Sequence, residues 1–159
     1  FFKPVPLKEE YRYHYFEPRF RLPLFQTVFH DSVIATHEAS FGSLKWKDQA
    51  RTVELLELLY QVPPLYHLNV PELQKRQAQI KRHYEFFSPL HRETALLPMT
   101  GFAWLTPDAT VQRATFGDQI EMVANFGPRD FRYGDTTLGP ESILARRRDS
   151  GKTQVYVPQ

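Results

Sequence analysis

The spacing of hydrophobic residues changes along the chain and predicts different elements in its first half. Residues 22–29 form a nearly continuous apolar run, LPLFQTVF, which is typical of a strand buried on both faces of a parallel sheet. Residues 48–60 place apolar side chains on one side of a helix, and the prolines that follow predict its end. The two segments are separated by a long loop, so the pattern indicates a strand–loop–helix unit.

A second unit of the same kind follows. Residues 65–68 predict a short strand, and Asn69 followed by Glu72 resembles a capping box at the start of a helix. We expect this helix to run to about residue 87 and to end at Ser88-Pro89. The order strand, loop, helix, strand, helix is typical of parallel βα units.

The pattern changes after residue 92 to short segments of alternating polarity joined by turns. Strands are predicted over residues 99–105, 110–116, 119–126, 142–145 and 153–157. In residues 119–126 apolar and polar side chains alternate, which predicts one buried face. The expected fold class is therefore α/β plus all-β, with the second half forming an antiparallel β-sandwich.

The charge and the cysteine content of the chain argue against several classes of function. The chain has 159 residues and a formal charge of +2, so electrostatics gives no reason to expect nucleic acid or a membrane as a partner. Arg146-Arg147-Arg148 is a basic cluster that we interpret as a solvated turn, with nucleic-acid binding as the alternative. Cysteine is absent, which excludes disulfides and thiolate metal sites. Because the chain starts with Phe1 rather than Met, we expect a piece of a longer protein.

Ionisable side chains follow the first predicted strand. His30 and Asp31 lie at its end, and His37 and Glu38 lie in the loop beyond it. The carboxyl ends of buried strands are where α/β enzymes hold their chemistry, and imidazoles and carboxylates suit sugar hydroxyls. The alternative is a His-Asp pair that only caps a neighbouring element. We also weighed Asp31 and Glu38 as a pair of catalytic carboxylates.

The same residues give little support for a metal site or a cofactor. The segment HEASF lacks the second histidine of the HExxH motif, because Phe41 occupies that position. Glycine-rich phosphate loops and serine nucleophile elbows are absent from the sequence. We therefore predict no metal and no cofactor. Trp46 has two open interpretations, stacking on a sugar face or anchoring its loop to the next helix.

Several quoted segments carry a family resemblance. The succession LPLFQTVFHDSV, PPLYHLN, HYEFFSPLHRE and FAWLTPDATVQRATFGDQIEMVANFG resembles the carboxyl-terminal portion of barrel glycoside hydrolases. The succession resembles in particular the α-N-acetylgalactosaminidases and related bacterial glycosidases. In that group a (β/α)8 barrel of the TIM type is followed by a β-sandwich domain. The resemblance covers most of residues 20–130.

The resemblance implies a division of the chain and a role for its parts. Residues 1–92 would contain the last βα units of a TIM-type barrel, and residues 93–159 would form the β-sandwich. The catalytic carboxylates of the family lie on earlier barrel strands, so the chain alone is expected to be inactive. The expected partners are a carbohydrate substrate and either the missing amino-terminal part of the same protein or a second copy of the chain. The compartment stays open, with secretion or periplasmic export as the favoured option.

The resemblance also implies which residues contact the sugar. His30 and Asp31 would orient its hydroxyls, while His37, Glu38 and Trp46 would shape the rim of the pocket. A different class of protein stays possible from the residues alone. In that alternative the chain is a non-catalytic carbohydrate-binding or protein-interaction module that uses exposed aromatics such as Tyr11, Tyr13 and Trp46.

Overall fold

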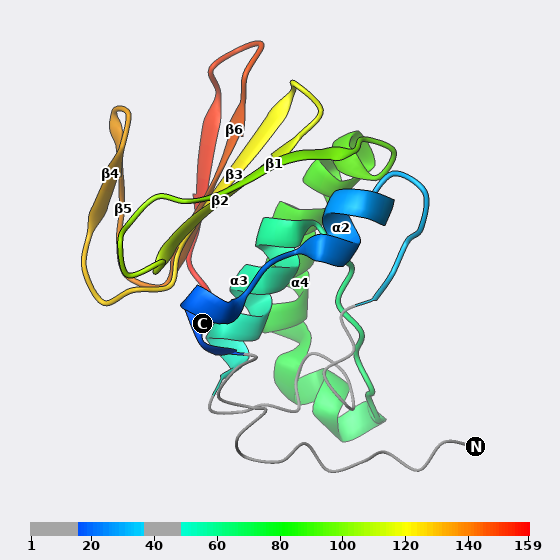
Figure 1. The fold of residues 1–159 in the computed structure, drawn as a ribbon. Coiled ribbons are helices and arrows are strands. Elements are labelled where there is room, and N and C mark those ends of the chain that lie inside the picture. The colour runs from blue at the N-terminus through cyan, green and yellow to red at the C-terminus, as the bar shows by residue number, and fades with distance from the viewer. Residues whose placement is uncertain (1–15, 37–48) are drawn as a thin grey trace.

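An antiparallel sheet with helices on one face dominates the structure (Figure 1). The structure is a computed structural model, and it describes residues 16–36 and 49–159. Its elements are, in chain order, η1 (Pro18–Phe20), α2 (Leu24–Phe29), α3 (Ala50–Tyr60), α4 (Val70–Thr94), β1 (Met99–Trp104), β2 (Val111–Phe116), β3 (Ile120–Asn125), β4 (Phe131–Tyr133), β5 (Thr136–Leu138), β6 (Ser142–Arg147) and β7 (Thr153–Tyr156).

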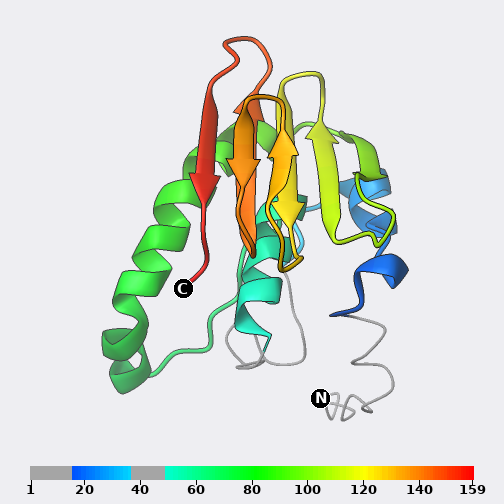
Figure 2. The same cartoon turned by 90° about the vertical axis from the view of Figure 1, so that its left-hand side faces the viewer.

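The sheet has five strands in the order β1-β2-β3-β6-β7, and every neighbouring pair is antiparallel. The strands predicted from residue 99 onward are therefore confirmed within two residues at each end. The short strands β4 and β5 form a separate two-stranded sheet, which lies on the side of the main sheet opposite to the helices (Figures 1 and 2). This hairpin was not predicted, because its strands are only three residues long.

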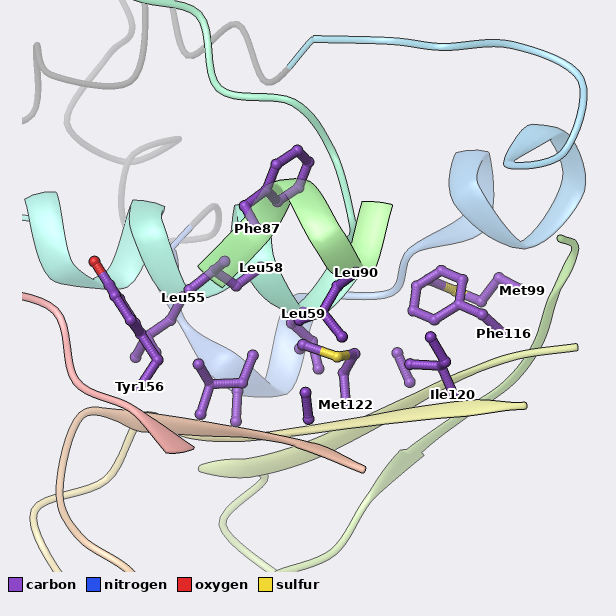
Figure 3. Close-up of a cluster of buried hydrophobic side chains, with 14 residues drawn as sticks. Leu55, Leu58, Leu59, Phe87, Leu90, Met99, Phe116, Ile120, Met122 and Tyr156 are labelled. Carbon is purple, nitrogen blue, oxygen red and sulfur yellow. The ribbon is translucent and has the colours of Figure 1, made fainter. Parts of the chain in front are cut away.

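The main hydrophobic core lies between the sheet and helices α3 and α4 (Figure 3). Strand β3 directs Ile120 and Met122 into it, and both side chains are almost completely buried. The helices supply Leu59 and Leu90, which are also buried. Each large side chain buried in this way contributes roughly 1.5–3 kcal/mol. The predicted apolar stripe of the first helix is confirmed as the surface that packs on the sheet.

The opposite face of the sheet carries a smaller core. Val111, Val123 and Leu144 from the main sheet pack there with Leu138 of the hairpin. All six residues of β3 are consequently buried. The prediction of a single buried face for this strand is wrong, because the unpredicted hairpin β4–β5 covers the second face.

The strand predicted over residues 22–29 is wrong. The chain forms the short helix α2 there instead, with the Thr27 amide donating to the Pro23 carbonyl at 2.8 Å and the His30 amide to the Gln26 carbonyl at 3.1 Å. A parallel strand must share its backbone hydrogen bonds with neighbouring strands. No strand of the described residues pairs with this segment through backbone hydrogen bonds, so its backbone groups bond locally as a helix.

Two predictions around α4 are corrected and one is confirmed. Residues 65–68 form an irregular connection rather than a strand. The Asn69 side chain caps α4 as expected, accepting a hydrogen bond from the Glu72 amide at 2.9 Å. The helix then continues through Pro89 to Thr94 instead of ending at residue 87. Burial of Leu90 and Thr94 against the sheet and α3 outweighs the backbone hydrogen bond that proline cannot make.

These corrections leave an antiparallel sheet with helices, and a fragment of a TIM-type barrel is not seen in residues 16–36 and 49–159. Helices α3 and α4 share one core with the sheet. The domain boundary expected between residues 92 and 93 stays a prediction. In the described part of the chain, no helix combines the length and apolarity that crossing a bilayer requires.

Candidate functional site

The structure separates His30 from Asp31 at the end of α2. The His30 ring is buried, and its Nδ1 donates to the Leu97 carbonyl at 2.8 Å. The same ring packs on Phe116 with a centroid distance of 4.6 Å. Because a carbonyl can only accept, this bond places the proton on Nδ1. His30 therefore ties α2 to the connection between α4 and β1.

Asp31 has a different environment. Its carboxylate is exposed and accepts a hydrogen bond from the Ser32 hydroxyl at 2.8 Å. The carboxylate stays available to a ligand arriving from solvent, whereas the His30 ring next to it in sequence points into the core. The two side chains thus do not form one site in the structure.

His37, Glu38 and Trp46 lie outside the described residues, as do Tyr11 and Tyr13. Their proposed contacts with sugar therefore stay predictions. In residues 16–36 and 49–159, no group of three His, Asp or Glu side chains is arranged to hold a metal ion.

A small cavity lies beside His30. Residues from α2, from the segment that follows it and from the ends of α3 and α4 line it, including Gln26, Gln61 and His91. Its volume is about 20 Å³, which suffices for about one water molecule and not for a sugar ring. Burial lowers the pKa of His91, and the nearby His30 lowers it further. A cavity of this size between packed side chains is suited to a water molecule rather than to a substrate.

A cluster of buried polar side chains lies elsewhere, between α3, α4 and β7. Glu54 and Glu57 are three residues apart on α3, and their exposed fractions are 5% and 1%. The Tyr156 hydroxyl on β7 donates to a carboxylate oxygen of Glu54. Figure 3 shows the Tyr156 ring beside Leu55, with its hydroxyl directed toward the helices. The bond therefore joins the helical layer to the last strand of the sheet.

The pKa of Glu54 is raised, chiefly by burial, and the neighbouring Glu57 raises it further. The hydrogen bond from Tyr156 opposes these effects by stabilising the charged form. Burial also raises the pKa of Tyr156, followed in importance by its bond to Glu54. The proton of this pair is therefore held more tightly than that of either group in water.

His83 completes the cluster. Its Nδ1 lies 3.0 Å from the Tyr66 hydroxyl and 4.0 Å from a carboxylate oxygen of Glu57. That second contact would be an ion pair only if the ring were protonated. Burial instead lowers the pKa of His83 to about 4, so the ring is neutral near pH 7. Tyr66 then donates to Nδ1, and the contact with Glu57 is not an ion pair.

A raised carboxyl pKa beside a second carboxylate is a feature of acid–base sites in glycoside hydrolysis. Glu54 and Glu57, however, are enclosed by packed side chains, and a sugar ring has no access to them in this arrangement. The cluster therefore supports the fold. Sequence reasoning missed it, although two Glu at i and i+3 within the apolar stripe of residues 53–59 gave a signal.

The basic cluster of β6 has structural partners. Arg147 makes a two-pronged contact with the Glu93 carboxylate, with its closest N–O distance at 2.6 Å. Arg146 and Arg148 flank the buried carboxylate of Glu121, with N–O distances of 4.0 and 3.5 Å, and Arg113 adds a third guanidinium at 3.7 Å. The interpretation of the triplet as a solvated turn is therefore corrected, because Arg146 and Arg147 belong to strand β6 and all three arginines have carboxylate partners.

Comparison with known protein families returns the glycosyl hydrolases. Residues 1–115, most of the 159-residue chain, match the family described as "Glycosyl hydrolases related to GH101 family, GH129", and the chain therefore belongs to it. The class implied by the sequence resemblance is thereby confirmed. The search of curated proteins finds no match to the chain.

Proposed function

We propose that this chain is the carboxyl-terminal part of a glycoside hydrolase that cleaves O-glycosidic bonds. Membership of the glycosyl hydrolase family supports the reaction class. Hydrolysis of this kind uses two carboxyl groups on either side of the scissile bond. We assign neither group to a residue of this chain, since the described pair Glu54 and Glu57 is enclosed. The catalytic pair would come from an amino-terminal barrel.

The observation that carries the proposal is the apolar surface of residues 20–34. Eight large apolar side chains of this segment are exposed, namely Phe20, Leu22, Leu24, Phe25, Val28, Phe29, Val33 and Ile34. Leu24 is 70% exposed and Val28 is 63% exposed. Folded proteins do not commonly expose so many neighbouring apolar side chains unless the surface contacts a partner.

We assign this surface to contact with the barrel of the same enzyme. The segment has the composition of a strand buried on both faces, yet in the described chain it is a short helix with its apolar side chains exposed. Barrel residues packed against α2 would cover the apolar side chains that are exposed in this structure. Association of two copies of this chain is the alternative occupant.

In that arrangement Asp31 is the residue on the described surface that we propose for sugar contact. Its carboxylate is exposed and can accept a hydrogen bond from a sugar hydroxyl. His30, His37, Glu38 and Trp46 stay candidates for the same pocket. We propose α-N-acetylgalactosaminides as the first substrates to test.

The experiment uses the enzyme with its amino-terminal barrel and an aryl α-N-acetylgalactosaminide. Asp31→Asn should lower kcat/KM at least tenfold, because a hydrogen bond to a charged group contributes about 1.5–3 kcal/mol. Asp149→Asn is the matched control, since Asp149 is an exposed aspartate that also precedes a serine in a turn. Equal activity of the two variants would exclude Asp31 from the site.

A second pair of variants tests the contact surface. Val28→Glu should leave the isolated chain folded, because this side chain is exposed there, and should abolish activity of the enzyme that contains the barrel. Leu73→Glu on α4 is the control, since Leu73 is also an exposed apolar residue on a helix. If Val28→Glu left the larger enzyme fully active, residues 20–34 would not contact the barrel.

A further inference from the structure

We propose that a hollow at one end of the sheet binds a neutral saccharide. The hollow has a volume of about 430 Å³. The loop between β1 and β2, the end of β3 and the loop leading to β4 form its walls. Small-molecule sites usually measure about 300–1,000 Å³, so one or two sugar rings fit. It shares no lining residue with the cavity beside His30.

The base of the hollow is rigid. Asn125 is 1% exposed, and its amide nitrogen donates to the carbonyls of Arg129 at 2.8 Å and Gly139 at 3.0 Å. Its amide oxygen accepts from the Gly127 amide at 2.9 Å. A side chain at Gly127 would meet Thr110 Oγ1 at 3.0 Å. The loop between β3 and β4 is therefore fixed before a ligand arrives, which reduces the entropy cost of binding.

The loop between β1 and β2 carries a carboxylate held in a defined orientation. The Oδ1 atom of Asp108 accepts hydrogen bonds from the Thr110 hydroxyl at 2.8 Å and from the Thr110 amide at 3.2 Å. Hydrogen bonds from Thr106 and Thr110 lower the pKa of Asp108 to about 2. Asp108 is therefore ionised throughout the neutral range, and its exposed side chain can accept bonds from a ligand.

The charges of the hollow point to the class of ligand. Arg129 Nη2 lies 3.6 Å from Asp108 Oδ2, and Asp130 also lines the hollow, so one guanidinium and two carboxylates face the same space. The carboxylates disfavour an anion, and the guanidinium disfavours a metal cation. A neutral ligand with many donors and acceptors can bond to both kinds of group, and vicinal sugar hydroxyls match this arrangement. Half-buried Phe131 and the prolines of the wall provide apolar surface for the C–H face of a sugar ring.

The probes are N-acetylgalactosamine, galactose and glucose, with sorbitol as an acyclic control. Titration of the isotope-labelled 159-residue chain, followed by amide chemical shifts, should give saturable changes at Thr110, Gly127 and Arg129 with at least one cyclic sugar. We expect binding in the millimolar range, because the site is open to solvent. Absence of saturable shifts with all three sugars, or equal shifts with sorbitol, would overturn the proposal.

Substitutions inside and outside the lining of the hollow test where the sugar binds. Asp108→Asn and Arg129→Gln should each weaken binding about tenfold, since each removes a charge-assisted hydrogen bond. Asp149→Asn and Arg132→Gln change the same residue types outside the lining and should bind as the unmodified chain does. Unchanged affinity in both hollow variants would overturn the proposal. Because the measurement involves no turnover, its outcome is separate from that of the hydrolysis experiments.

Discussion

Tyr156, on the last strand of the sheet, donates its hydroxyl hydrogen to the carboxylate of Glu54 on helix α3. The two residues are separated by 102 positions in sequence, and both are buried. Within residues 16–36 and 49–159, strand β7 is an edge strand that pairs with β6, so this contact fastens the edge of the sheet to the helical layer.

The first prediction concerns this bond. Tyr156→Phe removes the hydroxyl and leaves the buried Glu54 carboxyl without that partner. We expect the free energy of unfolding to fall by about 1–3 kcal/mol, measured by urea denaturation. Tyr84→Phe is the control, because Tyr84 is 58% exposed on α4, and its effect should stay within about 0.5 kcal/mol. Equal effects of the two variants would contradict the role of Tyr156.

The second prediction concerns the stability of the fold at pH values above the ordinary pKa of glutamate. The pKa of Glu54 is raised in the folded chain, so the folded state binds the proton more tightly than the unfolded state. The stability contributed by this group is complete below pH 4.5 and is lost as the pH rises through the raised value. Glu54→Gln keeps an acceptor for Tyr156 and cannot ionise. It should therefore be more stable than the unmodified chain at pH 8, as measured by the free energy of unfolding.

The gain of the Glu54→Gln variant should vanish at pH 4, where the carboxyl is protonated in both states. Parallel denaturation curves from pH 4 to 8 check this. A difference that did not depend on pH would show that Glu54 titrates as it does in water.

The third prediction concerns the stability of the fold at acidic pH. His83 has its pKa lowered from 6.5 to about 4 by burial, so the unfolded state binds a proton where the folded state does not. The stability contributed by the neutral ring is complete above pH 6.5 and is lost as the pH falls to 4, a change of about 3 kcal/mol. His83→Gln should remove most of this acid sensitivity. His67→Gln, at an exposed histidine, should leave the dependence unchanged.

The fourth prediction concerns the guanidinium groups around Glu121. Removing its buried charge leaves Arg113, Arg146 and Arg148 without their shared carboxylate. We expect Glu121→Gln to lower the free energy of unfolding by about 1–2 kcal/mol, because the guanidinium groups are partly exposed and solvent screens them. Glu141→Gln breaks an exposed pair with Arg51 and should cost less than about 0.5 kcal/mol. If the loss of unfolding free energy in Glu121→Gln were unchanged in 1 M salt, an electrostatic role for Glu121 would be contradicted.

The parts of the fold that the sequence predicted are those specified by local patterns. The alternation along residues 119–126 defined β3, and the helical stripe containing Leu55 and Leu59 defined α3. Both elements meet in one core, so local preference and tertiary packing agree there. The cap at Asn69 was equally predictable from the sequence, because its side chain bonds to a backbone amide only three residues away.

The failures arise where distant chain decides the outcome. Residues 22–29 have the composition of a buried strand, but a strand needs neighbours, and without them the segment forms α2. Pro89 is a helix breaker by local rules, yet burial of Leu90 keeps α4 intact. The Glu54–Tyr156 contact joins residues 102 positions apart, which a single sequence does not reveal. The hollow around Asp108 depends on how the loops at the ends of β1, β2 and β3 pack, which a single sequence does not reveal either.

The final prediction tests whether this chain acts as one part of a glycoside hydrolase whose catalytic carboxylates lie in a barrel. The direct measurement is hydrolysis of an aryl α-N-acetylgalactosaminide by the purified 159-residue chain and by the enzyme that includes the barrel, at equal molar concentration. We expect turnover only from the enzyme with the barrel. We also expect that enzyme to be monomeric and soluble, with its residues 20–34 protected from solvent. Turnover by the 159-residue chain alone would contradict the account.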